Sequence, residues 1–192
     1  MRFFKQLSIA SLIILLSITG CKDPKEDPAP NNVNRGESSF DGNNYHMTSG
    51  LIENFGTDSN PSSGLNFEGN WMDLRIISEG LHFTQGSGKK YLEGTGFALY
   101  LEMFSSSDNG IAPGDYTLNH ENFVPTGYYH YGEVQVLING QFIHYSNLYS
   151  GTAKVTRNGG EYEISFEGLN IDKKPITVYY KGELDFIDYT TN

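Results

Sequence analysis

The chain has 192 residues, a formal net charge of −10 and a single cysteine. The acidic charge excludes a surface built for nucleic acid or for anionic lipids, because both need clustered Lys and Arg. One cysteine excludes an intramolecular disulfide, so the folded part must be stable through its core alone.

Residues 1–20 have the composition of a secretory signal peptide. Arg2 and Lys5 give a positive start, a mainly apolar stretch covers residues 7–18, and two small residues follow it. The apolar stretch has about 12 residues, whereas a helix that spans a bilayer needs roughly 20. The segment therefore predicts a cleaved signal peptide and not a permanent transmembrane helix.

The only cysteine closes the segment Ile18-Thr19-Gly20-Cys21. This segment resembles the lipobox of bacterial lipoproteins, which has an aliphatic residue, two small residues and a cysteine. The resemblance implies cleavage between Gly20 and Cys21 and attachment of fatty acyl chains, such as palmitate, to Cys21. Two or more chains make membrane attachment stable, where one chain is marginal. The alternative is an ordinary signal peptide followed by a stray cysteine.

Residues 21–36 are expected to be the lipidated cysteine and a disordered tether. The segment has three prolines, many charges and one aliphatic residue larger than alanine, so it cannot bury enough surface to offset its chain entropy. Such a tether spans on the order of 20 Å. Lys22-Asp23 and Lys25-Glu26-Asp27 resemble the signals of surface-exposed lipoproteins in bacteroidete-type bacteria. The resemblance implies an outer-membrane protein displayed on the cell surface, with a periplasm-facing anchor as the alternative.

Residues 37–192 are expected to form one all-β domain. The composition favours Gly, Asn, Ser, Tyr and Phe over helix-forming residues. Tyr162, Ile164 and Phe166 alternate with polar residues, as in a strand with one buried face. The pairs Asn139-Gly140 and Asn158-Gly159 predict hairpins with type I′ turns, which need positive φ at both central residues.

Alternation and turn residues together predict about nine or ten strands, with no helix after the signal. Residues 40–45 predict a first hairpin, and the strand after it carries Tyr45 and Met47. The other strands have the approximate ranges 72–76, 81–83 (as the hairpin partner of 72–76), 97–104, 115–118, 134–138, 142–146, 151–156, 161–167 and 176–187. This spacing favours an antiparallel β-sandwich. The alternative is a closed up-and-down β-barrel of the lipocalin-like kind.

Two further segments resemble small all-β lipoprotein domains of bacteroidete-type bacteria. One is the strand of residues 97–107 followed by Pro113-Gly114-Asp115-Tyr116-Thr117, and the other is Lys181-Gly182-Glu183-Leu184. The resemblance carries no functional residues with it, so function must be argued from the side chains.

The sequence contains no catalytic motif, and we expect no cofactor and no metal. The glycine-rich residues 86–90 lack the spacing and the hydroxyl residue of a phosphate-binding loop. Asp58, Asn60 and Ser62 alternate as in a calcium loop, but position twelve is Gly69 where that loop needs glutamate. The five histidines are not paired at metal spacing.

The recognition candidates are aromatic. Tyr128, Tyr129 and Tyr131 crowd a segment with turn residues, and Trp71 offers another ring. Rings with a polar tip suit contact with sugars or proteins. The alternative is that these rings enter the core as a strand begins.

The sequence thus predicts a lipid-anchored cell-envelope protein whose domain is a non-catalytic binding or accessory module for a glycan or protein ligand. Two other functions stay open. A closed barrel could carry a small hydrophobic ligand, and two facing carboxyl groups could make a glycan hydrolase.

Overall fold

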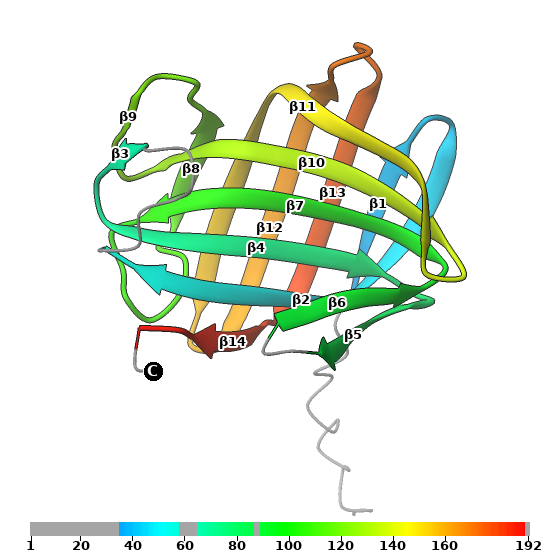
Figure 1. Cartoon of the computed structure of the whole chain (residues 1–192), viewed down its shortest axis with the longest axis horizontal. Helices are drawn as coiled ribbons and strands as arrows, with labels where there is room; N and C mark the ends of the chain where they lie inside the picture. The colour runs from blue at the N-terminus through cyan, green and yellow to red at the C-terminus, as the bar shows by residue number, and fades with distance from the viewer. Residues whose placement is uncertain (1–34, 58–64, 87–88, 191–192) are drawn as a thin grey trace, which may run out of the picture. The chain divides into compact units, whose positions relative to one another are not determined.

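A computed structural model describes residues 35–57, 65–86 and 89–190. The predicted signal peptide, Cys21, nearly all of the predicted tether and the segment 58–64 lie outside the described residues. The described chain has fourteen strands and no helix, which confirms the all-β prediction (Figure 1). None of its segments is a helix long and apolar enough to cross a membrane.

Eight long strands, each antiparallel to the next, form a closed ring. They are β1 (Arg35–Phe40), β2 (Asn43–Gly56), β4 (Asn70–Ser78), β7 (Gly96–Ser105), β10 (Tyr128–Ile138), β11 (Gln141–Asn158), β12 (Glu161–Asn170) and β13 (Pro175–Glu183). β1 closes the ring, because Glu37 lies opposite His46 of β2 on one side and Tyr179 of β13 on the other. This pairing is that of an up-and-down barrel.

The ring is flattened into two layers. In Figure 1, β2, β4, β7 and β10 run across the front, and β11, β12 and β13 cross behind them at a steep angle. The structure has features of both expected folds. Its layers pack face to face as in a β-sandwich, and its strand pairing is continuous as in a β-barrel.

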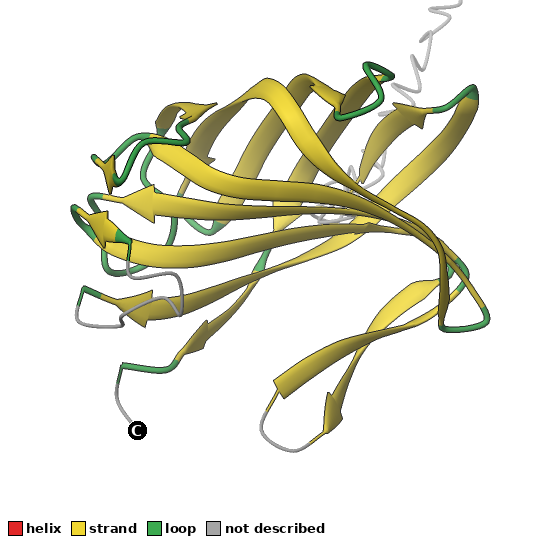
Figure 2. Ribbon diagram, turned by 45° about the horizontal axis from the view of Figure 1, so that its top comes forward, coloured by secondary structure: helices red, strands yellow, loops and turns green. Residues whose placement is uncertain are grey.

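Six shorter strands complete the domain. β8 (Gly114–Leu118) lies between β10 and β11, β14 (Asp185–Asp188) pairs with β2, β3 (Asn66–Phe67) pairs with β9 (Phe123–Val124), and β5 (Leu81–Gly86) pairs with β6 (Lys89–Gly94). Figure 2 shows the β5–β6 hairpin standing away from the two layers. The expected pairing of residues 81–83 with 72–76 is therefore wrong. The expected strand 176–187 also divides in two, because β12 has no residue left to pair beyond Glu183.

Tight turns join the strands largely as predicted. Asn139 and Gly140 have φ of 51° and 75°, and Asp41 and Gly42 have 50° and 77°, so both turns have the two positive φ values of type I′. The third hairpin turns one residue later than predicted, because Asn158 still pairs with Glu161.

The interior of the ring is filled by side chains. Inward-facing residues alternate along every strand, and each of the following is at most 4% exposed: Met72, Leu74, Ile76, Phe97, Leu99, Leu101, Met103, Tyr129, Ile164, Phe166, Val178 and Tyr180. Such packing at interior density stabilises the ring and leaves its outer surface to carry the ligand contacts.

Replacing Phe40 should destabilise the domain strongly. Phe40 is 2% exposed at the end of the closing strand and packs 5.9 Å from the Phe97 ring, so Phe40→Ala should lower the free energy of unfolding by about 3–5 kcal/mol. Urea denaturation measures the loss. The control Phe123→Ala, at a ring 54% exposed, should change it by less than about 0.5 kcal/mol. Equal losses would contradict a core built around the closing strand.

Candidate functional site

The predicted recognition residues divide between the two faces of the front layer. Tyr128 begins β10 and is half-buried, so the segment is a strand and not an open loop. Tyr129 is 0% exposed, and its hydroxyl donates to the Gly151 carbonyl at 3.2 Å. Tyr129 is therefore a core residue and not a ligand contact. Tyr131 and Trp71 lie on the outer face.

A bulge separates Tyr129 from Tyr131. Tyr129 pairs with Met103 and Tyr131 pairs with Glu102, which leaves His130 as an extra residue in β10. Simple alternation would put both tyrosines on one face, and the bulge shifts that alternation by one residue. As a result Tyr131 points out of the ring while Tyr129 points into it.

Polar and aromatic side chains form a strip across the middle of the outer face. Two cross-strand rows build this outer strip: Glu53, Asp73, Glu102 and Tyr131 in the first, and Arg75, Tyr100, Glu133 and Asn147 in the second. Directly opposed side chains on neighbouring strands have Cβ atoms about 4.5–5.5 Å apart. The rows therefore bring four carboxyl groups, three of them in one row, beside a single arginine.

Apolar contacts lie at both ends of the outer strip. At one end, Ile77, Ala98 and Leu137 pack beneath side chains of the β5–β6 hairpin. At the other end the Phe67 ring lies 4.8 Å from Phe104, and Phe55 lies 4.7 Å from Trp71. These contacts help to exclude water from the strip.

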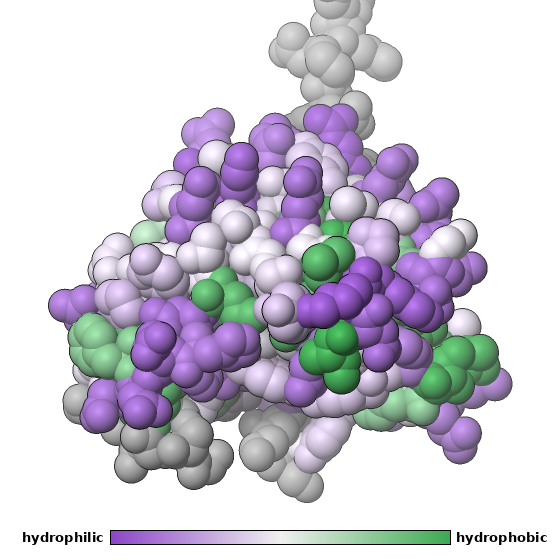
Figure 3. All heavy atoms as spheres, turned by 90° about the horizontal axis from the view of Figure 1, so that it is seen from above, coloured by the Kyte–Doolittle hydropathy of each residue, from purple (hydrophilic) through white to green (hydrophobic). Residues whose placement is uncertain are grey.

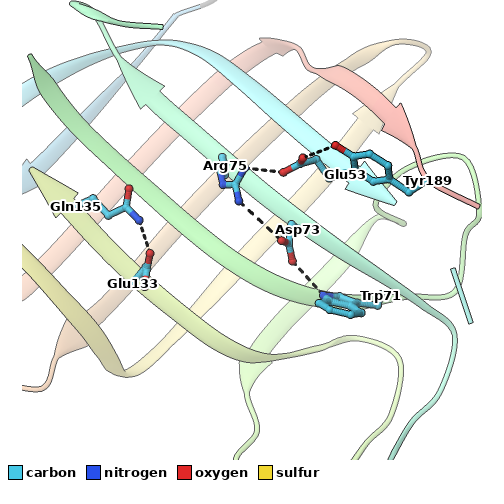
Figure 4. A network of polar contacts seen from close by, with 7 residues as sticks. All are labelled: Glu53, Trp71, Asp73, Arg75, Glu133, Gln135 and Tyr189. Atoms are coloured by element: carbon cyan, nitrogen blue, oxygen red, sulfur yellow. Dashed lines mark hydrogen bonds and ion pairs between the residues drawn. The ribbon is translucent and has the colours of Figure 1, made fainter. Parts of the chain in front are cut away.

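Arg75 and its neighbours form the first half of a hydrogen-bonded network (Figure 4). Arg75 Nη1 donates to Glu53 Oε2 at 2.6 Å, and Arg75 Nη2 lies 4.0 Å from Asp73 Oδ2. Trp71 Nε1 donates to Asp73 Oδ1 at 3.0 Å, and the Tyr189 hydroxyl donates to Glu53 Oε1 at 3.1 Å. The ring of Trp71 is thereby fixed beside a carboxyl group.

Glu133 is the centre of the second half. The Tyr131 hydroxyl donates to Glu133 Oε2 at 2.5 Å, and the Gln135 amide donates to Glu133 Oε1. The Tyr145 hydroxyl lies 2.6 Å from the Tyr131 hydroxyl, and Asn147 Oδ1 lies 2.9 Å from it. Because Glu133 is only 6% exposed, these partners supply the hydrogen bonds that water would otherwise make.

Burial changes the protonation of the carboxyl groups. Asp73 is 6% exposed, and loss of water raises its pKa to about 7, although a hydrogen bond from Tyr100 and the charge of Arg75 act in the opposite direction. Burial also raises the pKa of Glu102 to about 6. The pKa values of both groups lie near neutral pH because burial disfavours the charged form of each carboxyl group.

The outer strip suits a ligand with many hydroxyl groups and no negative charge. Half-buried rings at Trp71, Tyr100 and Tyr131 offer apolar faces, and carboxylate and amide oxygens beside them accept hydrogen bonds. An anionic ligand would meet the four carboxyl groups of the two rows. The strip can therefore combine stacking with hydrogen bonding to a neutral ligand.

Sequence reasoning missed most of these residues. Glu53, Tyr100, Glu102 and Glu133 lie on four segments, and only the strand order brings them together. One local signal was present: the alternate residues Trp71, Asp73 and Arg75 interleave with the apolar residues of the same strand.

A second surface feature is a concavity of about 640 Å³ over β1, β2, β12 and β13. Its lining combines hydroxyl, amide and carboxyl groups with the ring-bearing residues Tyr45, His46, Phe166 and Tyr179. The Tyr179 hydroxyl already donates to Glu163 at 3.1 Å. Within the described residues no group of three His, Cys, Asp or Glu side chains is arranged to hold a metal ion.

Comparisons of the chain with protein-family models, with curated proteins and with solved structures find no match. The argument for function therefore rests on the outer strip and on the sequence.

Replacing Asp73 should change the pH dependence of stability. The folded carboxyl keeps its proton up to about pH 7, whereas the unfolded one loses it near pH 4, so its charging destabilises the fold as pH rises through this window. Asp73→Asn removes the charge, and with it the loss of stability at high pH. At pH 8 the variant should therefore have a free energy of unfolding up to a few kcal/mol above that of the native chain. Thermal unfolding at pH 4 and pH 8 measures the difference.

The exposed Asp115 of β8 provides the control. Asp115→Asn should unfold with the pH dependence of the native chain, because this side chain keeps its water in the folded state. If Asp73→Asn also followed the native pH dependence, the buried carboxyl would not titrate as described.

Proposed function

We propose that this chain is a lipid-anchored protein of the outer membrane, displayed on the cell surface. The lipobox-like segment Ile18-Thr19-Gly20-Cys21 supports the anchor, and the Lys and acidic residues after Cys21 support display. An acidic domain gains no electrostatic attraction to anionic lipids, so acyl chains on Cys21 would supply its stable attachment to a membrane.

The proposed task of the domain is non-catalytic binding of a neutral glycan on the outer strip. The single observation that carries this proposal is the combination of rings and buried acceptors on one sheet face. Trp71 and Tyr131 each donate to a carboxyl group that is 6% exposed, so both rings are held in place before a ligand arrives. Held rings lose little freedom on binding, which favours affinity.

Hydrolysis of the bound glycan is the second candidate function. It is favoured by the difference between Asp73, whose pKa is raised to about 7 by burial, and Glu53, which is ion-paired with Arg75 at 2.6 Å. Neighbouring carboxyl groups in different surroundings can act as acid and base. Binding is preferred because both groups are buried beneath their hydrogen-bond partners. The carrier function has less support, since side chains fill the interior of the ring.

Replacing the two rings should abolish glycan binding without unfolding the domain. Trp71→Ala and Tyr131→Ala should each weaken binding of a neutral oligosaccharide at least tenfold, because each removes a stacking face. Calorimetric titration against neutral oligosaccharides measures the affinity. Tyr179→Ala, on the opposite layer, is the matched control and should bind as the native chain does.

Three outcomes are distinguishable in that experiment. Equal binding by all variants would show that the outer strip is not the binding site. Binding restricted to anionic oligosaccharides would contradict the proposal that the ligand is neutral. Release of new reducing ends during incubation, abolished by Asp73→Asn, would replace binding with hydrolysis as the function.

Replacing Cys21 should release the protein from membranes. Cys21→Ala removes the only thiol that can carry lipid, so fatty-acid labelling should disappear and most of the chain should leave the membrane fractions. Fractionation with metabolic labelling by a fatty acid measures anchor and lipid together. A native chain that is cleaved but unlabelled would refute the anchor, whereas Asp23→Ala should leave both labelling and retention unchanged.

A further inference from the structure

Exposed apolar side chains are concentrated in one part of the surface. Ten large hydrophobic residues are exposed among the described residues. Six of them lie in the β10–β11 hairpin and in the loop between β12 and β13. This hairpin patch consists of Ile138, Phe142, Ile143, Tyr145, Tyr149 and Ile171, which are 46–59% exposed. The two segments are joined, because the Ile171 N–H donates to the Asn147 carbonyl at 2.9 Å.

Two bulges in β11 help to create the hairpin patch. Phe142 pairs with Leu137 and His144 with Val136, which leaves Ile143 as an extra residue. Further along, Leu148 pairs with Asn170 and Ser150 with Leu169, which leaves Tyr149 as an extra residue. Bulges usually turn a strand edge away from unwanted contacts. Here each extra residue is a large apolar one, so the irregularities increase apolar exposure.

The hairpin patch is locally neutral although the chain is acidic. Lys174 Nζ lies 2.8 Å from Asp41 Oδ2, and the Lys173 ammonium lies over the Tyr149 ring. These two lysines offset Asp41 and Asp172. In Figure 3, which looks at the molecule from above, hydrophobic areas interrupt the hydrophilic surface on the right, the side on which Figure 1 draws the β10–β11 hairpin.

This composition fits the interface of a lipid bilayer. Aliphatic and phenyl side chains enter the acyl boundary, tyrosines keep their hydroxyl groups among the headgroups, and lysine stems extend their charge toward water. A sugar would use the tyrosines but would find no partner for the exposed isoleucines. The exposed isoleucines therefore favour lipid over glycan at this place.

The expected length of the tether permits this contact. Arg35 begins β1, and Phe40 ends it at the end of the ring that carries the β10–β11 and β12–β13 turns. A strand of six residues is about 20 Å long. Thirteen residues separate Cys21 from Arg35, and a chain of that length reaches at most about 45 Å. The lipid on Cys21 and the hairpin patch can therefore meet one bilayer, an argument that rests on the proposed lipidation.

We propose that the hairpin patch is a second membrane contact, in which Ile138, Phe142 and Ile143 enter the interface of an uncharged phospholipid bilayer. The contact orients the domain on the membrane that holds its lipid.

Vesicle binding without the lipid tests this proposal. The chain from residue 22 onward contains the whole compact unit Asn32–Asn192 and lacks both the signal and the lipidated cysteine. It should sediment with phosphatidylcholine vesicles, and the double variant Phe142→Ser/Ile143→Ser should bind at least tenfold more weakly. The control Phe123→Ser, at an equally exposed ring of β9, should bind as the native chain does. Unchanged thermal unfolding of both variants shows that they are folded.

Other results would overturn the proposal. They are no vesicle binding by the native chain, equal binding by the double variant, or binding only when phosphatidylglycerol is added. A dimer in sedimentation equilibrium that the double variant abolishes, without vesicle binding, would assign the hairpin patch to a second copy. Glycan binding measured on the same variants, and fatty-acid labelling of the full chain, test the proposed function separately, so failure of one leaves the other standing.

Discussion

The fold depends on the double pairing of β1. This strand of six residues is bonded to β2 on one side and to β13 on the other, which makes one ring from two layers. Closure removes the free sheet edges at that seam. It also forces every second residue inward, where rings such as Phe40 and Phe97 fill the space. The consequence for function is that ligand contacts must be sought on the outside of the ring.

Bulges determine which side chains lie on the outer surface of the ring. His130, Ile143 and Tyr149 are each an extra residue in a strand, and each shifts the alternation of the side chains that follow. The first bulge turns Tyr131 to the outer face, and the other two expose apolar side chains along β11. Tyr145 belongs to both surfaces. It is 56% exposed in the hairpin patch, and its hydroxyl lies 2.6 Å from the Tyr131 hydroxyl of the outer strip.

The outer strip contains carboxyl groups that are buried from water, and two different effects accommodate them. Glu53 is stabilised by direct hydrogen bonds from Arg75 and Tyr189, whereas Asp73 responds to burial with a pKa raised to about 7. Replacing such groups with apolar side chains is often neutral or stabilising, because burying a charge costs more than a single partner returns. Their presence here is consistent with a surface kept for recognition.

The sequence by itself determined the all-β class, most strand positions and the type I′ turn at Asn139-Gly140, because alternation and turn chemistry are local. It also offered Trp71, Tyr128, Tyr129 and Tyr131 as recognition candidates, of which Trp71 and Tyr131 are half-buried on the outer face. Only the tertiary structure decided that the strands close into a ring, that Tyr129 is core, and that Glu53, Asp73 and Glu102 share one row. Those results depend on strand order and on bulges, which are set by contacts between segments far apart in the chain and therefore leave no local pattern.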